Sequence, residues 1–495
     1  MWSSDFRIKN KILLLFLSNY FILLLSLVGT NVSSTTTIPQ KRNIIVLLFP
    51  DGSGSNYQIK SLFDHSLISN PNYLYHVILH KADYKIWKEK TGKTNNSQFK
   101  FYTFGKTEKL ESLESLSGKS FNRDILAPRM QLFIQDFTES KILEQLKKEN
   151  VNYDLLETDV PNYLSVIIKD TFKIERVIYL SHRPLPQIFG RTFELNPSYY
   201  PNIGSTNGQV LSFKERFISY FYYLQEKLYA WINQGKELKL LSSLGYSTEN
   251  LKDVYIYKSL VLLQYPEGLG FPLSMPPNMN LLNGFNIYDY EASSQKSSEN
   301  IIYVNKDIYE NNKKIFDKNP HYKFTTFPQD LYKNSNSNVK CAIVKDFNEI
   351  TMSLVNSVPV LVYRDGMMWK NIQTFVKEKK YGDTIENLSE YESKVKTISN
   401  DLIYKINLEK VARIFKGNKD ARERYVHWVN YGFRHGYDTL VVGLYEKGNW
   451  FSIRGIDVFA FSVGCVLLVV FLMYSMIRLF LRTCSRKTVK KVKKD

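Results

Sequence analysis

The pattern of apolar positions predicts an alternation of buried strands and amphipathic helices. The apolar run 43–49 is typical of a strand buried on both faces, and a polar loop with two glycines follows it at 50–55. A helix is predicted from about Tyr57, because apolar residues then recur at helical spacing, at Ile59, Leu62, Phe63 and Leu67. Strand, glycine-containing turn and helix in this order predict the opening of a Rossmann-like unit.

The same alternation returns further along the chain. A second unit begins at 153–159 and continues into a strand at 176–180, before a long helix predicted at 213–232. The proline-containing stretch 272–283 is unfit for a helix or a central strand and suits a linker. The segments expected beyond it are two strands and the helix between them, at 339–344, 358–363 and 348–356. The pattern therefore predicts two α/β domains around a cleft.

An apolar run near the N-terminus follows three basic residues. Arg7, Lys9 and Lys11 precede the run, which ends at Val28 beside small residues. This is the order of a secretory signal peptide, residues 1–30, and an uncleaved anchor is the alternative.

A second apolar run lies near the C-terminus, at 458–477. It has about twenty residues without a charge, enough for a helix to cross a hydrocarbon core of about 30 Å. The tail 478–495 then carries eight basic residues and one acidic residue, Asp495. The excess of positive charge predicts a transmembrane helix with its tail in the cytosol. Lys491 and Lys493 resemble a dilysine retrieval signal, with a plain stop-transfer cluster as the equal alternative.

Charge and cysteine content agree with this topology. Part of the net charge of +18 belongs to the tail, so nucleic acid is not expected as a partner. Of three cysteines, Cys465 lies in the predicted span and Cys484 in the tail, which leaves Cys341 without a luminal partner. No Cys/His spacing predicts a metal site. Sequons that a luminal body would expose to glycosylation are at Asn31, Asn95 and Asn387.

Several short segments resemble, in order, the membrane-bound UDP-glucuronosyltransferases. They are Asn196-Pro197-Ser198-Tyr199-Tyr200-Pro201 with 211–217, Met275-Pro276-Pro277-Asn278 with Asn283-Gly284, 327–331, 428–436, and Trp450-Phe451 with 456–458. The resemblance implies two Rossmann-like domains facing a cleft, the glycosyltransferase B type, plus the C-terminal transmembrane helix. In that fold the first domain takes a lipophilic acceptor and the second takes a UDP-sugar.

The domain boundaries expected from this resemblance cover the whole chain. They are 1–30 for the signal peptide, 31–270 for the acceptor-type domain, 271–285 for the linker, 286–440 for a shortened donor-type domain, 441–457 for the membrane approach, 458–477 for the transmembrane helix and 478–495 for the tail.

The catalytic half of the expected site has lost its base. Sugar transfer needs a group that takes the acceptor's hydroxyl proton, and a neutral histidine with a carboxylate partner suits this task. The resemblance places the base at Asn56, whose amide cannot act as one, and the partner carboxylate at Asp159. A helix N-cap before Pro161 is the alternative role for Asp159. His65 is the nearest histidine but lies two turns into the predicted helix.

The donor half has diverged further. The family's histidine and glycine pair correspond to Val344-Lys345-Asp346, which places a carboxylate where the diphosphate belongs. The sugar-binding aspartate and glutamine correspond to Met367-Met368, and the tryptophan that stacks on uracil corresponds to Thr326. The donor-binding residues that remain are Gln329 and Asn348.

The resemblance implies transfer of glucuronic acid or another hexose from a UDP-sugar, the co-substrate, to a small lipophilic acceptor, without a cofactor or a metal. The substitutions predict that this transfer is impaired. The alternative is a non-catalytic binding protein or a partner subunit of related transferases, so homo- and hetero-oligomers are both open. The expected location is the endoplasmic reticulum membrane, with one span, a luminal body and a cytosolic tail.

Overall fold

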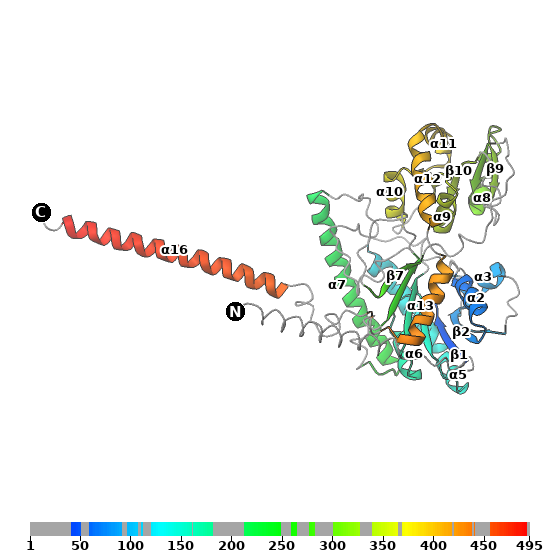
Figure 1. Cartoon of the computed structure of the whole chain (residues 1–495), viewed down its shortest axis with the longest axis horizontal. Helices are drawn as coiled ribbons and strands as arrows, with labels where there is room; N and C mark the ends of the chain where they lie inside the picture. The colour runs from blue at the N-terminus through cyan, green and yellow to red at the C-terminus, as the bar shows by residue number, and fades with distance from the viewer. Residues whose placement is uncertain are drawn as a thin grey trace, which may run out of the picture. The chain divides into compact units, whose positions relative to one another are not determined.

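The structure is a computed structural model, and it contains two parallel β-sheets flanked by helices (Figure 1). It describes residues 41–50, 59–91, 97–106, 110–111, 120–160, 162–181, 212–248, 259–264, 277–282, 300–326, 339–364, 369–417, 420–437, 440 and 456–492. The expected signal peptide, 1–30, lies outside these residues. So do Asn56, Gln329 and the pair 367–368.

The first sheet has strand order β3-β2-β1-β4-β5-β6-β7, and all its strands are parallel. The strands are β1 (Arg42–Leu47), β2 (Tyr73–His80), β3 (Phe99–Phe104), β4 (Leu155–Thr158), β5 (Val177–Ser181), β6 (Leu260–Gln264) and β7 (Met279–Leu282). Strands β1 and β5 are apolar over most of their length, as expected for a parallel sheet covered on both faces. This is the strand order of a doubly wound, Rossmann-like domain.

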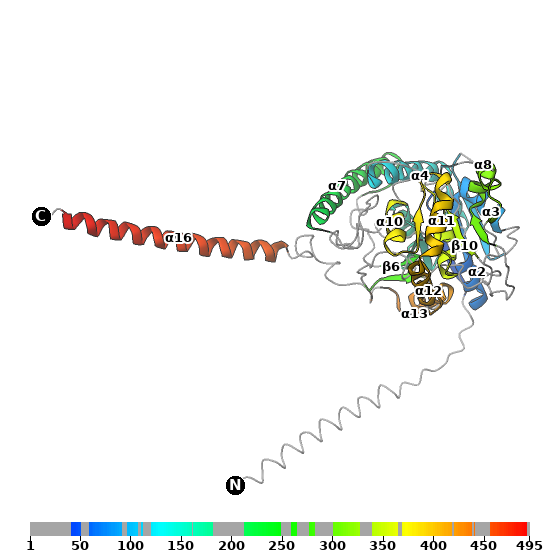
Figure 2. The same ribbon diagram turned by 90° about the horizontal axis from the view of Figure 1, so that it is seen from above.

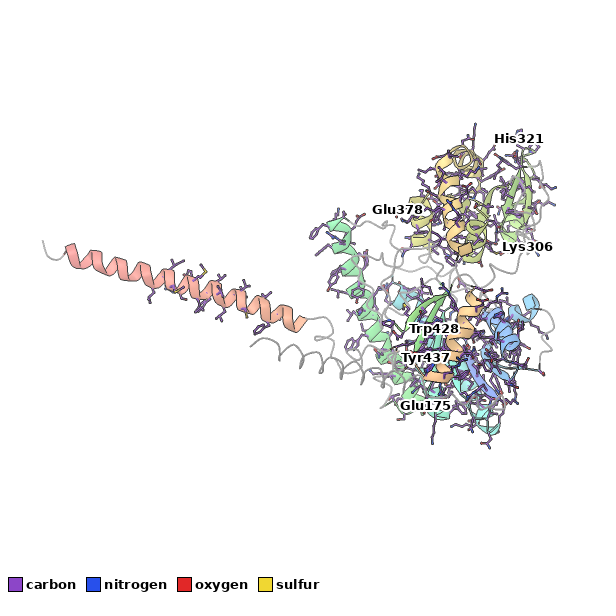
Figure 3. The ribbon with its side chains drawn as sticks, viewed as in Figure 1. Glu175, Lys306, His321, Glu378, Trp428 and Tyr437 are labelled. Carbon is purple, nitrogen blue, oxygen red and sulfur yellow. The ribbon has the colours of Figure 1, made fainter. Side chains whose placement is uncertain are left out.

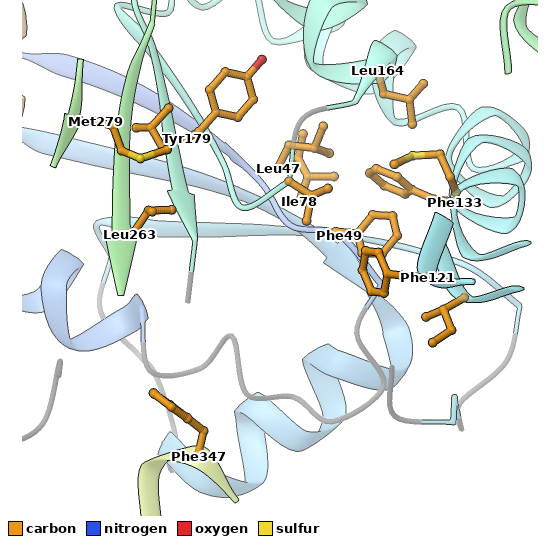
Figure 4. Packing of buried hydrophobic residues seen from close by; sticks show 14 of the residues in the cluster. Leu47, Phe49, Ile78, Phe121, Phe133, Leu164, Tyr179, Leu263, Met279 and Phe347 are labelled. Carbon is orange, nitrogen blue, oxygen red and sulfur yellow. The ribbon is translucent and has the colours of Figure 1, made fainter. Parts of the chain in front are cut away.

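Aromatic packing fixes the end of β1. Phe49, just beyond the strand, is buried and meets Phe133 edge-to-face, with ring centroids 5.4 Å apart (Figure 4). Leu47 and Ile78 from the neighbouring strands belong to the same core. The contact between sheet and helix therefore fixes the carboxyl end of β1.

Helices connect and cover these strands. They are α2 (Ile59–Ser69), α3 (Lys81–Thr91), the π-helical turn η3 (Phe121–Leu126), α4 (Ala127–Glu139), α5 (Ile142–Lys148), α6 (Tyr163–Phe172) and α7 (Phe213–Ser243). Helix α2 buries the predicted apolar positions, which confirms that prediction. Helix α7 begins where predicted, with a capping box between Ser212 and Glu215, but it continues eleven residues beyond the predicted end at 232.

The second sheet has strand order β12-β11-β10-β8-β9, again parallel. Its strands are β8 (Ile301–Val304), β9 (Lys323–Thr326), β10 (Val339–Val344), β11 (Val360–Val362) and β12 (Gly382–Thr384). The helices around it are α8 (Lys306–Phe316), α9 (Phe347–Val355), α10 (Lys370–Glu378), the 3-10 turn η8 (Leu388–Glu390), α11 (Tyr391–Asn400) and α12 (Leu402–Gly417). The prediction of two Rossmann-like α/β units is confirmed.

The boundary between the two units differs from the sequence prediction in two places. Part of the expected linker 271–285 forms β7, which pairs with β6 as the edge strand of the first sheet. An edge position tolerates the prolines just before it, because only one side of the strand is paired. The last helix of the expected donor-type domain, α13 (Ala421–His435), packs on the first unit instead of the second.

Helix α13 is attached to the first sheet by aromatic packing and by polar contacts. It lies among the blue and green elements of that sheet in Figure 1. Tyr73 on β2 donates a hydrogen bond to Asn430, and Arg176 donates to the carbonyl of Gly432. At the end of the helix the Tyr437 hydroxyl donates to the carbonyl of Trp428, and both residues are labelled in Figure 3.

A fully buried carboxylate lies beneath α13. Glu157 on β4 accepts a hydrogen bond from the Tyr425 hydroxyl at 2.7 Å, and Tyr425 lies 3.2 Å from the Tyr75 hydroxyl. Burial raises the pKa of Glu157 to about 8, because the charged form loses its hydration. Glu157 is therefore mostly protonated at neutral pH.

A single helix, α16 (Ile456–Val492), follows near the C-terminus. Its side chains before residue 460 and after residue 479 lie outside those that the structure describes. Within the part of the chain that the structure describes, no helix is long and apolar enough to cross a membrane.

The buried carboxyl of Glu157 predicts a pH-dependent stability. Its pKa is raised from an ordinary value of 4.5, so its contribution is fully present below about pH 4.5 and is lost as the pH rises through about 8. The loss amounts to about 1.4 kcal/mol per pH unit within that window. We expect the melting temperature of the wild-type chain to fall relative to that of Glu157→Gln between these pH values. Parallel melting profiles would contradict this assignment.

Candidate functional site

The two sheets each have a point where the strand order reverses. In the first sheet β1 is paired with β2 on one side and with β4 on the other, so the reversal falls between β1 and β4. In doubly wound folds the ligand crevice lies at the carboxyl ends of the strands at such a point. Phe49 follows β1 and Asp159 follows β4, so both residues lie there.

Asp159 joins the two strands at this position. Its Oδ1 atom accepts a hydrogen bond from the backbone N–H of Phe49 at 2.8 Å, and the side chain is buried. The alternative prediction, that Asp159 caps the following helix, is wrong. Asn162 is the N-cap of α6, because its side chain accepts from the N–H of Ser165. Asp159 is thus held at the carboxyl end of β1, beside Phe49.

In the second sheet the reversal falls between β8 and β10. Asn305 follows β8, and the turn Lys345–Asp346 joins β10 to α9. The backbone N–H groups of such a turn, at the N-terminus of a helix, form a ready site for an anion. In this chain the two N–H groups already donate to a side chain of the protein itself.

The carboxylate of Glu349 occupies these donors. Its Oε2 atom accepts from the N–H of Lys345 at 3.1 Å and from the N–H of Asp346 at 3.2 Å. Its Oε1 atom accepts from the Asn305 side chain at 2.6 Å, across the point of reversal. Burial, and then the nearby Asp346 carboxylate, raise the pKa of Glu349 to about 7.

Two cationic side chains beside this turn are also engaged. The Lys345 ammonium forms an ion pair with Asp307. The Arg364 guanidinium donates to the carbonyl of Lys345 at 2.7 Å and lies over the Trp369 ring, 5.1 Å from its centroid. The turn is therefore braced by contacts within the protein on both sides.

A histidine and a carboxylate also lie near the carboxyl end of the first sheet, on β2 and α4. The Nε2 atom of His80 lies 3.3 Å from Asp136 Oδ2, and its Nδ1 atom accepts from the N–H of Ala82. Burial lowers the pKa of His80, which is fully buried, and the imidazole is closely covered by Gly105 at a positive φ. This pair has the chemistry of a base and its partner, but its burial identifies it as a structural contact.

Comparisons with known proteins show what this chain is similar to. A family model described as UDP-glucoronosyl and UDP-glucosyl transferase matches residues 369–494. UDP-glucuronosyltransferase 1A8 of Rattus norvegicus is 24% identical over 443 residues, which cover 79% of this chain and 81% of the relative. UDP-glucuronosyltransferase 1A8 of Homo sapiens is 24% identical over 406 residues, 72% of this chain and 76% of the relative. These similarities support a member of the UDP-glucuronosyltransferase/UDP-glycosyltransferase family.

A solved structure is similar to this chain in fold. The glycotransferase of kitacinnamycin is similar at a TM-score of 0.50 and 13% identity, covering 80% of this chain and all of that one. The similarity agrees with two Rossmann-like units of the glycosyltransferase B type. The expectation that the two units face a common cleft remains a prediction.

The structure describes only part of the predicted site. Asp159 lies at the reversal point of the first sheet, and its role as the partner carboxylate stays a prediction. Asn348 lies in the first turn of α9, and its side chain is outside those described. Asn56 and Gln329 fall outside the described residues, so their predicted roles are untested.

Sequence reasoning missed Glu349 and Asn305. The spacing Asp346-x-x-Glu349 at the start of a helix is close to that of a capping box, in which the third helical residue accepts from the N-cap N–H. This spacing can be read from the sequence, and it explains the hydrogen bond between the Asp346 N–H and Glu349 as helix capping. The same contact also occupies two N–H groups at a helix N-terminus, which are groups of the kind that commonly hold a diphosphate.

This geometry predicts a gain of nucleotide affinity when Glu349 is shortened. Glu349→Ala frees the N–H groups of Lys345 and Asp346, and one charge-assisted hydrogen bond gained by a phosphate corresponds to about tenfold in the dissociation constant. We expect calorimetric titration with UDP to show binding at least about tenfold tighter than to the wild-type chain.

Two variants control this experiment. Glu349→Gln keeps an oxygen that can accept from the same N–H groups, so its gain should be smaller. Glu310→Ala removes an exposed carboxylate from α8, away from the turn, and should leave UDP binding unchanged. Wild-type binding as tight as that of Glu349→Ala would show that Glu349 does not obstruct the turn.

Proposed function

We propose that this chain is a membrane-bound member of the UDP-glycosyltransferase family in which sugar transfer is impaired. The family reaction moves glucuronic acid or another hexose from a UDP-sugar to a small lipophilic acceptor. The observation that carries the proposal is the Glu349 carboxylate on the N–H groups of the turn between β10 and α9. A second anion cannot accept from the same donors while Glu349 remains in place.

The acceptor side supports the same conclusion. An effective base needs a pKa near the working pH and a position within hydrogen-bond reach of the hydroxyl. The residue in the base position is Asn56, which has no useful basicity. Asp159 keeps its place, but its Oδ1 atom accepts from the Phe49 backbone. The carboxylate therefore supports the sheet end even where no histidine stands beside it.

A non-catalytic role on the same scaffold is the second candidate. Both halves of the site carry substitutions at once, at Asn56 and at 344–346, and joint loss is what relaxed selection on catalysis produces. Such a protein would bind lipophilic molecules or pair with related transferases. It differs from an impaired enzyme in showing no transfer with any UDP-sugar.

We also propose a single membrane span and a luminal body in the endoplasmic reticulum. The support is the uncharged run 458–477 within α16 and the basic tail that follows it. The sequon residue Asn387 is exposed at the start of the η8 turn, where an oligosaccharide transferase could reach it.

An assay of sugar transfer tests the proposed activity. The full chain is offered UDP-glucuronic acid, UDP-glucose and UDP-N-acetylglucosamine with a panel of lipophilic phenols, beside rat UDP-glucuronosyltransferase 1A8. We expect turnover at least about a hundredfold below that of the relative, since a general base alone contributes about 10²- to 10⁴-fold. Asn56→His alone should not restore it, because the donor turn stays filled. Turnover equal to the relative's would refute impaired transfer.

The location is tested separately by glycosylation. In cells with an intact secretory pathway, we expect the chain to carry a glycan that endoglycosidase H removes, as for a protein retained before the Golgi. Asn387→Gln should lose one such glycan, whereas Asn407→Gln, which is outside a sequon, should lose none. A chain without glycans would contradict a luminal body.

A further inference from the structure

Helix α7 presents a long apolar stripe to the outside of the protein. Phe213, Phe217, Phe221 and Trp231 are between 64% and 77% exposed, and Leu228 is about half exposed. Their spacings of four, four, seven and three residues bring them to one side of a helix. At the helical rise the stripe is about 27 Å long. Few soluble monomers leave an apolar surface of this kind uncovered.

The opposite side of α7 packs on the first unit, and four of the five buried residues of the helix are small or polar. These four are Ser219, Ala230, Asn233 and Glu237, and the fifth is Leu241 near the C-terminal end of the helix. The helix lies beside α4 and η3 (Figure 2), and Arg123 of η3 donates to the Tyr229 hydroxyl at 3.2 Å. Helix α7 is thus reversed relative to an ordinary surface helix, whose apolar side faces its own core. Its apolar side is available for another surface.

The charges of α7 indicate which surface this is. The exposed charged side chains include Lys214, Arg216, Lys236 and Lys239. The helix has three acidic residues. Glu237 is buried, Glu226 is half-buried, and Glu215 accepts from the N–H of Ser212 in the capping box. The outward side of α7 is therefore apolar with basic residues around it.

We propose that α7 lies on a membrane and that its aromatic stripe enters the interface between headgroups and acyl chains. Trp, Phe and Leu on one side, with basic residues beside them, are the composition of helices that lie in the plane of an anionic membrane surface. Pairing with a second α7 would bring lysines of one copy against those of the other, so charge favours anionic lipid over a second copy. This contact is additional to the proposed span in α16 and does not depend on catalytic activity.

Trp231 provides a direct probe of this contact in the full chain. The protein and its Trp231→Phe variant are reconstituted into vesicles of phosphatidylcholine with a minor fraction of phosphatidylserine. The difference between their emission spectra isolates Trp231, because the other tryptophans, including Trp450 beside the proposed span, contribute to both. We expect brominated acyl chains to quench most of this difference emission and aqueous iodide to leave it unchanged.

Two other results would each overturn the proposal. Quenching by iodide without quenching by bromolipid would place Trp231 in water, and protection from both would show that a protein, including a second copy, covers the stripe. The double variant Lys214→Glu/Arg216→Glu should weaken bromolipid quenching of Trp231 when phosphatidylserine is present. The matched control is Lys313→Glu/Lys314→Glu on the exposed side of α8, which should leave the bromolipid quenching of Trp231 unchanged. UDP binding in the same vesicles reports on the donor site alone, so the two proposals fail separately.

Discussion

Backbone N–H groups at the carboxyl ends of parallel strands need acceptors, and this chain supplies them from its own carboxylates. Asp159 accepts from Phe49 where the first sheet reverses its order, and Glu349 accepts from the β10–α9 turn where the second sheet does. Buried backbone donors are costly to leave without partners, so these contacts stabilise the two strand ends. The same positions in a doubly wound fold are where ligands bind. Stability and ligand binding therefore compete for the same atoms.

The protein's own carboxylates accept hydrogen bonds at both points where the strand order reverses. At the first point, Asp159 accepts from the backbone N–H of Phe49. Glu349 accepts from two backbone N–H groups and from the Asn305 amide, and we propose that it takes the place of a diphosphate at this helix N-terminus. With a pKa near 7, it carries part of its negative charge at neutral pH. A bound nucleotide would have to displace this internal anion.

The alternation of apolar segments was enough to predict the two parallel sheets, because strands buried on both faces are continuous in sequence. The prediction failed for β7 and α13, because tertiary contacts determine where these two elements pack. The edge strand β7 follows two prolines, and α13 packs on the distant first sheet through Tyr425 and Glu157, which lie 268 residues apart. At the candidate site, Asp159 was predicted through the family resemblance, and its role there stays a prediction. Glu349 was missed because a helix-capping glutamate has no feature in sequence that marks it as filling a ligand site.

The central claim is that Glu349 fills the diphosphate position of the donor-type unit. It is tested most directly by an experimental structure of the full chain in saturating UDP-glucuronic acid. The account predicts Glu349 still bonded to the N–H groups of Lys345 and Asp346, with no nucleotide on that turn. A diphosphate accepting from those two N–H groups, with Glu349 turned away, would contradict it.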